Sequence, residues 1–77
     1  MKIKVLFFGR LAELAEVNEV ELQEINNTAA LHEYIKAHYQ QLMNSKFAVA
    51  VNKKITGHEV EFSNGDVIAL IPPFSGG

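Results

Sequence analysis

The residues of this chain that can do chemistry on another molecule lie at its end, where Pro72 to Gly77 read Pro-Pro-Phe-Ser-Gly-Gly. Prolines lack backbone N–H donors, so an apolar strand over residues 66–71 cannot stay paired beyond them. We therefore expect residues 72–77 to leave the folded body as a flexible tail. Because glycine carries no side chain, a tail that ends in Gly76-Gly77 can enter a narrow slot and present its terminal carboxylate to the active site of another protein.

No other set of side chains predicts catalysis or metal binding. His32 and His38 are six residues apart, which is the wrong spacing for two ligands on one helix face. His58 has only Glu59 and Glu61 close to it in sequence, and the chain has no cysteine. We therefore expect no bound metal or cofactor. We also expect His38 to pack on the sheet and His32 to face solvent.

The composition indicates one small domain that depends on apolar packing. The chain has 77 residues, 48% of them hydrophobic, and a net charge of −2 with scattered basic residues, which argues against nucleic acid as a partner. The opening apolar run, Val5 to Phe8, is shorter than the roughly 7–15 residues of a secretory signal, and no run approaches the about 20 residues of a membrane span. We expect a cytoplasmic protein without membrane contact.

The elements that must position the tail follow from hydrophobic periodicity. Residues 2–8 and 18–22 alternate as strands, and we expect them to pair antiparallel across a connection, residues 10–16, with helix-forming composition. Residues 29–43 predict the main helix, with Asn27 or Thr28 as its N-cap. The face of this helix directed at the sheet is expected to carry Leu31, Ile35, His38 and Leu42.

The second half of the chain predicts further strands. Residues 46–52 are β-rich and apolar, residues 59–62 form a short edge or cover strand, and residues 66–71 form the last strand, after a turn in which Gly65 can take a positive φ. This order predicts the α+β class and a ubiquitin-like β-grasp domain over residues 1–77. It has a mixed sheet, one main helix on one face, and parallel first and last strands in the middle.

One helix leaves the other sheet face uncovered. Leu6 and Phe8 of the first strand belong to this face, together with either Val67, Ala69 and Ile71 or Ile68 and Leu70 of the last strand. An exposed apolar patch on so small a domain indicates a protein interface. Alternatively, the connection over residues 10–17 folds across the patch, and the sequence does not choose between the two.

The chain resembles the small subunit of molybdopterin synthase (the MoaD family), a ubiquitin-like sulfur carrier, over its whole length. The resemblance is carried by the opening Lys4-Val5-Leu6-Phe7-Phe8, by Arg10-Leu11-Ala12-Glu13-Leu14, by Ala50-Val51-Asn52 and, most specifically, by the ending. That ending runs from Gly65-Asp66 through an apolar strand to Pro-Pro, an apolar residue, Ser and Gly-Gly.

The resemblance implies that the terminal carboxylate of Gly77 is adenylated with ATP, converted to a thiocarboxylate, and used to donate sulfur to a cyclic pterin, which becomes the molybdopterin dithiolene. It implies two partners, a molybdopterin synthase large subunit (MoaE-like) and an adenylating activating enzyme (MoeB-like). It also implies a heterotetramer of two small and two large subunits. The chain itself is then a non-catalytic, sulfur-donating subunit, and the active-site groups belong to the large subunit.

Within this interpretation each tail residue has an expected role. Gly77 carries the reacting group, and the expected partner-binding residues are Gly76, Ser75, Phe74, Pro73, Pro72, Phe8 and Leu6. Phe74 is the expected apolar anchor, and the two prolines lower the ordering cost of insertion. The alternatives are a sulfur carrier for thiamine thiazole synthesis (ThiS-like), a carrier for tRNA thiolation or protein conjugation, and a ubiquitin-like binding module with an inert tail.

Overall fold

The computed structural model describes residues 1–73. Its elements are β1 (Lys2–Phe7), α1 (Arg10–Ala15), β2 (Glu19–Gln23), α2 (Thr28–His38), a 3-10 turn η1 (Gln40–Leu42), β3 (Ala48–Val51), β4 (Lys54–Thr56) and β5 (Val67–Ile71). In this part of the chain no helix combines the length and the apolar character needed to cross a membrane.

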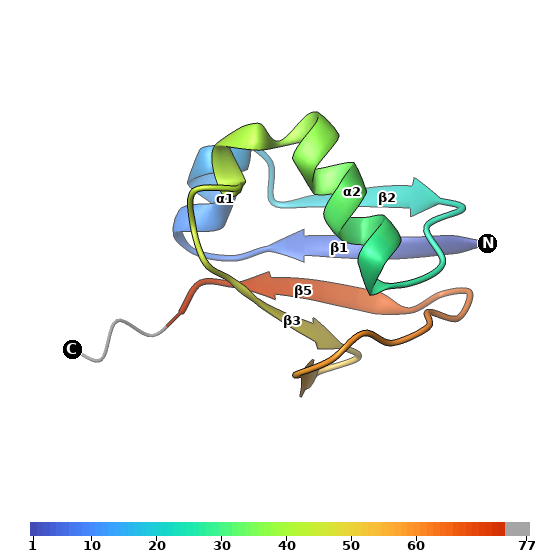
Figure 1. The fold of residues 1–77 in the computed structure, drawn as a ribbon. Coiled ribbons are helices and arrows are strands. Elements are labelled where there is room, and N and C mark those ends of the chain that lie inside the picture. The colour runs from blue at the N-terminus through green and yellow to red at the C-terminus, as the bar shows by residue number, and fades with distance from the viewer. Residues whose placement is uncertain (74–77) are drawn as a thin grey trace.

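The strands form one mixed sheet in the order β2-β1-β5-β3-β4. β1 and β5 lie in parallel at the centre, with Val5 opposite Ile68 and Phe7 opposite Leu70, and the other pairs are antiparallel. Helix α2 crosses one face of this sheet (Figure 1). The predicted α+β, ubiquitin-like β-grasp arrangement is confirmed.

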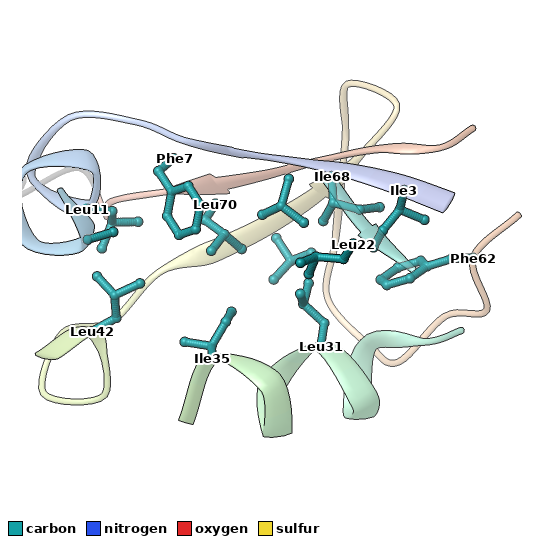
Figure 2. Close-up of a cluster of buried hydrophobic side chains, with 13 residues drawn as sticks. Ile3, Phe7, Leu11, Leu22, Leu31, Ile35, Leu42, Phe62, Ile68 and Leu70 are labelled. Carbon is teal, nitrogen blue, oxygen red and sulfur yellow. The ribbon is translucent and has the colours of Figure 1, made fainter. Parts of the chain in front are cut away.

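The two central strands bury alternate residues, as their sequence pattern requires. On β1 the side chains of Ile3, Val5 and Phe7 are buried, and on β5 Ile68 and Leu70 are fully buried. Figure 2 shows Ile3, Phe7, Ile68 and Leu70 on the side of the sheet that faces Leu31 and Ile35 of α2, and Val5 belongs to the same buried cluster. The structure therefore decides the orientation of the last strand: Val67, Ala69 and Ile71 lie on the face opposite α2.

The connection between β1 and β2 closes the end of the core beside α2. Leu11 and Ala15 of α1 are buried with Leu42 of η1, and the Gln41 side-chain amide donates to the Leu14 carbonyl at 2.7 Å. Figure 1 shows α1 and the η1 turn side by side on the α2 side of the sheet. The alternative in which residues 10–17 cover the other face is therefore wrong.

The main helix is shorter than predicted, and its cap is Asn27. The Asn27 side chain accepts from the Ala30 N–H at 2.8 Å, which satisfies one of the free amides of the first turn. The helix ends at His38 rather than at residue 43 because Tyr39 takes φ −136° and ψ 58°, outside the helical region. Leu42 still reaches the core, but from the separate 3-10 turn.

The helix histidines differ in part from the prediction. His38 is exposed and stacks on Tyr34 with ring centroids 4.3 Å apart, so the expectation that it packs on the sheet is wrong. His32 is exposed to solvent, as predicted, and its ring stacks on Phe47. The buried residues of α2 are Thr28, Leu31 and Ile35, so the buried face of the helix ends at Ile35, before His38.

The short fourth strand, β4, lies at residues 54–56 rather than at the predicted 59–62. Asn52 and Lys53 take φ values of 50° and 75°, and this pair of left-handed residues makes the tight hairpin that returns the chain as β4. Residues 59–62 instead pass beside the start of α2. There the Thr28 hydroxyl donates to the Val60 carbonyl at 3.1 Å and accepts from the Val60 N–H at 2.9 Å.

Candidate functional site

The predicted end of the paired sheet is found at the prolines. Ile71 is the last residue of β5, and the Phe8 N–H donates to the Leu70 carbonyl at 3.2 Å, one of the final bonds between the central strands. Pro72 is half-buried and Pro73 is exposed. Because neither proline can donate to a ladder, the chain leaves the sheet here, beside the start of α1.

Four predicted site residues lie outside the described residues: Phe74, Ser75, Gly76 and Gly77. Their roles as anchor, slot-binding residue, spacer and sulfur-carrying residue therefore remain predictions. The structure does place the other four predicted site residues. Pro72 and Pro73 begin the tail, Phe8 immediately precedes Gly9 beside Pro72, and Leu6 lies opposite Ala69 of β5.

Gly9 lies directly against Pro72, the first residue of the tail, and its importance was not predicted from the sequence. Its φ of 55° and ψ of −131° are strained for any L-residue with a side chain. A Cβ at this position would lie only 3.1 Å from Cγ of Pro72. The signal available in the sequence was a glycine directly between a strand and a helix, which indicates a sharp change of chain direction.

The sheet face opposite α2 is a shallow apolar hollow of about 520 Å³. We call this the open face, and its apolar residues are Leu6, Phe8, Ala50, Ile55, Val67, Ala69 and Ile71. The register explains their alignment: Leu6, Ala69, Ala50 and Ile55 are successive cross-strand neighbours on β1, β5, β3 and β4. Phe8 and Ile55 are 47% and 66% exposed, which is unusual for such large apolar side chains.

The open face continues up to the base of the tail. Ile71, which belongs to the open face, immediately precedes Pro72 in the chain. Phe8 immediately precedes Gly9, the residue that lies against that proline. The open face and the start of the tail are therefore continuous at Ile71 and Pro72. The prediction that Leu6 and Phe8 lie on an uncovered face is confirmed, whereas Ile55 was missed because β4 was not predicted.

Among residues 1–73 no three His, Asp or Glu side chains lie close enough together to hold a metal ion. No buried side-chain nitrogen or oxygen in this part of the chain lacks a hydrogen-bond partner. The arrangement is a mixed sheet with an exposed apolar face, whose strand β5 ends at Ile71 immediately before the two prolines.

Comparisons with known proteins agree with this geometry. A family model described as the ThiS family matches residues 5–77. The molybdopterin synthase sulfur carrier subunit of Haemophilus influenzae is 34% identical, over 97% of this chain and 99% of its own length. A solved Pyrococcus furiosus protein described as molybdopterin converting factor, subunit 1, has a TM-score of 0.83 at 29% identity, covering 96% of this chain and 99% of that chain.

A further solved structure shares the fold. It is a complex of subunits 1 and 2 of the molybdopterin-converting factor from Helicobacter pylori, and its similar chain has a TM-score of 0.79 at 24% identity, with 100% of both chains covered. The family match begins within β1 and runs through the Gly-Gly ending. The chain therefore belongs to the ThiS family, and within it resembles the sulfur carrier subunits of molybdopterin synthase.

Proposed function

We propose that this chain is the sulfur carrier subunit of a molybdopterin synthase and that Gly77 carries the sulfur. The observation that supports this most strongly is the near-full-length match to curated sulfur carrier subunits, together with a family match that includes Gly76 and Gly77. The fold adds a physical reason, because β5 delivers the chain directly into the two prolines that end the sheet.

The proposed chemistry begins with activation of the Gly77 carboxylate, since a carboxylate repels nucleophiles and its oxygen is a poor leaving group. A carboxylate oxygen attacks the α-phosphorus of ATP on an activating enzyme, and pyrophosphate leaves. The terminal sulfur of a persulfide on a donor protein then attacks the acyl carbon, and AMP leaves. A thiol cleaves the resulting acyl disulfide at the donor sulfur and forms a new disulfide with it, and Gly77 keeps the sulfur as a thiocarboxylate.

The thiocarboxylate is then used on a large subunit. We propose that the tail enters a slot of that subunit, that the open face binds beside the slot, and that the acids and bases for transfer to a cyclic pterin belong to the large subunit. The Helicobacter pylori neighbour, described as a complex of subunits 1 and 2, supports a partner of this kind. A heterotetramer in the cytoplasm, with an adenylating enzyme as second partner, completes the proposal.

The principal alternative is a carrier of the same family that serves thiamine thiazole synthesis. It shares the Gly-Gly ending and the thiocarboxylate, so the family match alone does not exclude it. The curated relatives favour the molybdopterin assignment, because the Haemophilus influenzae and Escherichia coli proteins both bear that name at 34% and 30% identity.

The test is intact-mass analysis after incubation with ATP, a sulfur donor and the activating enzyme from the same organism. The full chain should gain the mass difference between sulfur and oxygen, located on Gly77 by fragmentation, whereas a chain lacking Gly77 should gain nothing and melt at the same temperature. A thiocarboxylate on the shortened chain would overturn the assignment to Gly77. Covalent attachment of Gly77 to lysines instead would indicate a protein modifier.

A further inference from the structure

Two basic side chains flank the point where the tail leaves the sheet. A hollow of about 320 Å³ at this point is lined by Arg10, Leu11, Ser45, Lys46, Pro72 and Pro73. We call Arg10 and Lys46 the tail-base cations. They come from different elements, since Arg10 begins α1 and Lys46 precedes β3, and both side chains are exposed.

The tail-base cations have no carboxylate partner within the described part of the chain. The ion pairs of residues 1–73 join the N-terminal amine to Glu24 at 3.1 Å and Lys4 to Glu19 at 3.8 Å, and neither involves Arg10 or Lys46. No Asp or Glu lines the hollow. The chain as a whole carries a net charge of −2, so this positive site is opposite in sign to the molecule around it.

Other lysines do not contribute to this site. Lys2 and Lys4 belong to β1, and Lys4 lies opposite Val67, the first residue of β5, whereas the tail follows Ile71 at the other end of that strand. Two of the seven basic residues therefore stand where the tail must enter a partner.

We propose that the tail-base cations bind carboxylate side chains at the mouth of the large-subunit slot that receives the tail. This inference rests on the proposed function and adds the chemistry by which the slot recognises the carrier. The apolar open face and the tail give the interface its area, and the two charged contacts fix the rotation of the carrier about the axis of the tail.

A protein carboxylate fits the site better than a free phosphate. Both cations are exposed, the rest of the lining is largely apolar, and a small hydrated anion would gain only two mobile side chains there. A carboxylate that is fixed on the surface of a partner loses no further translational entropy once the partner is bound, unlike a free phosphate. Apolar residues next to that carboxylate can pack on the rings of Pro72 and Pro73. Complementary charge also raises the association rate and leaves a complex that can dissociate, as a carrier requires.

The experiment measures binding of the full chain to the large subunit from the same organism by calorimetry at several salt concentrations. The double variant Arg10→Gln with Lys46→Gln is compared with Lys2→Gln with Lys36→Gln, which removes the same charge from exposed positions elsewhere. We expect the tail-base variant to lose affinity on the order of tenfold at low salt and to show a weaker salt dependence. The control variant should bind like the unmodified chain.

The outcomes separate this proposal from the proposed function. If the unmodified chain does not bind the large subunit, both are overturned. If it binds and the two variants have the same affinity and salt dependence, only the role of the tail-base cations is overturned. Melting curves must first show that both variants are folded.

A second measurement tests the alternative ligand. The chain alone is titrated with inorganic phosphate and with ATP while the amide signals of Arg10 and Lys46 are followed by NMR. We expect no saturable shift at millimolar concentration. A saturable shift that the tail-base variant abolishes would assign the site to a phosphate ligand and overturn the proposal of a protein carboxylate.

Discussion

At the scale of single residues, the direction of the tail depends on Gly9 and Pro72. Gly9 holds φ 55° and ψ −131° directly beneath the proline ring, so the start of the tail packs against backbone rather than against a side chain. This contact joins the end of β1 to the end of β5, the two strands at the centre of the sheet. A change at Gly9 should therefore affect both the start of the tail and the stability of the fold.

Gly9→Ala should destabilise the fold by about 1–3 kcal/mol and weaken binding to the large subunit. The new methyl group meets Pro72 at 3.1 Å, and the backbone conformation is strained for alanine. The control is Gly57→Ala, because no atom lies within 4 Å of the added carbon there. Urea unfolding and calorimetry measure the two effects, and equal behaviour of the two variants would contradict the role of Gly9.

Phe74 lies outside the described residues, and its role is predicted from the sequence. Phe74→Ala should weaken binding to the large subunit by about 2 kcal/mol or more, as expected for an aromatic anchor at an interface. The free energy of unfolding should not change. Calorimetry with the large subunit checks this, and an unchanged dissociation constant would show that the anchor is another residue.

At the scale of elements, the turn that follows α2 contains a group with a perturbed pKa. Burial, and secondly the neighbouring Tyr34, raise the pKa of Tyr39 above its ordinary value. Its ring packs on Phe7 of β1 at a centroid distance of 5.3 Å, so Tyr39 links the end of the helix to the central strand. The folded chain therefore holds this proton more tightly than the unfolded chain does.

This raised pKa predicts a loss of stability at alkaline pH. The contribution of Tyr39 to the free energy of unfolding is fully present below the ordinary tyrosine pKa of about 10. It falls as the pH rises from there toward the raised pKa. Tyr39→Phe should remove this part of the decrease in the free energy of unfolding at alkaline pH, whereas Tyr34→Phe should keep most of it. Urea unfolding at a series of pH values measures the slopes, and the same slope for Tyr39→Phe and the unmodified chain would contradict the account.

The elements also show which features the sequence can predict. β1 and β5 were predictable because alternation and unbroken apolar runs are local patterns, and the tail exit was predictable because proline acts through its own backbone. The end of α2 was not, because Tyr39 leaves the helix to pack on a residue more than thirty positions earlier. The turn at residues 52–54 could be predicted, but β4 was missed because it has only three residues, Lys54–Thr56, too few to show a periodic pattern.

The candidate site was predictable to a similar degree. Leu6, Phe8 and the prolines were found from strand parity and from turn chemistry. Ile55, Gly9 and the tail-base cations were not, because their importance comes from which strands and loops meet at the tail exit, and only the three-dimensional structure brings these together.

At the scale of the whole molecule, the two sheet faces have different tasks. One face packs on α2, α1 and η1 and supplies the core, while the open face leaves large apolar side chains exposed next to the tail. A domain of this size gains little stability from such exposure, and a patch of this kind is typical of a protein interface. This division agrees with the proposed function, in which the chain end enters the large subunit and the open face binds beside it.

Phe8→Asp should weaken binding to the large subunit by about 2 kcal/mol or more, because it places a charge on the open face where an apolar partner surface is expected. The fold should persist, since the side chain is 47% exposed. Ala37→Asp adds the same charge at an exposed position of α2 and should leave binding unchanged. Equal affinities of the two variants would show that the open face does not contact this partner.

The most direct test of the central claim is a single-turnover transfer reaction. The chain is first converted to its Gly77 thiocarboxylate with labelled sulfur, then mixed with the large subunit and the cyclic pterin precursor, without ATP or sulfur donor. We predict that the label leaves Gly77, that the carrier returns to the mass of the free carboxylate, and that labelled sulfur appears in the pterin product, with two carriers consumed for each dithiolene formed. A thiocarboxylate that forms but keeps its label in the presence of large subunit and precursor would contradict the proposed function.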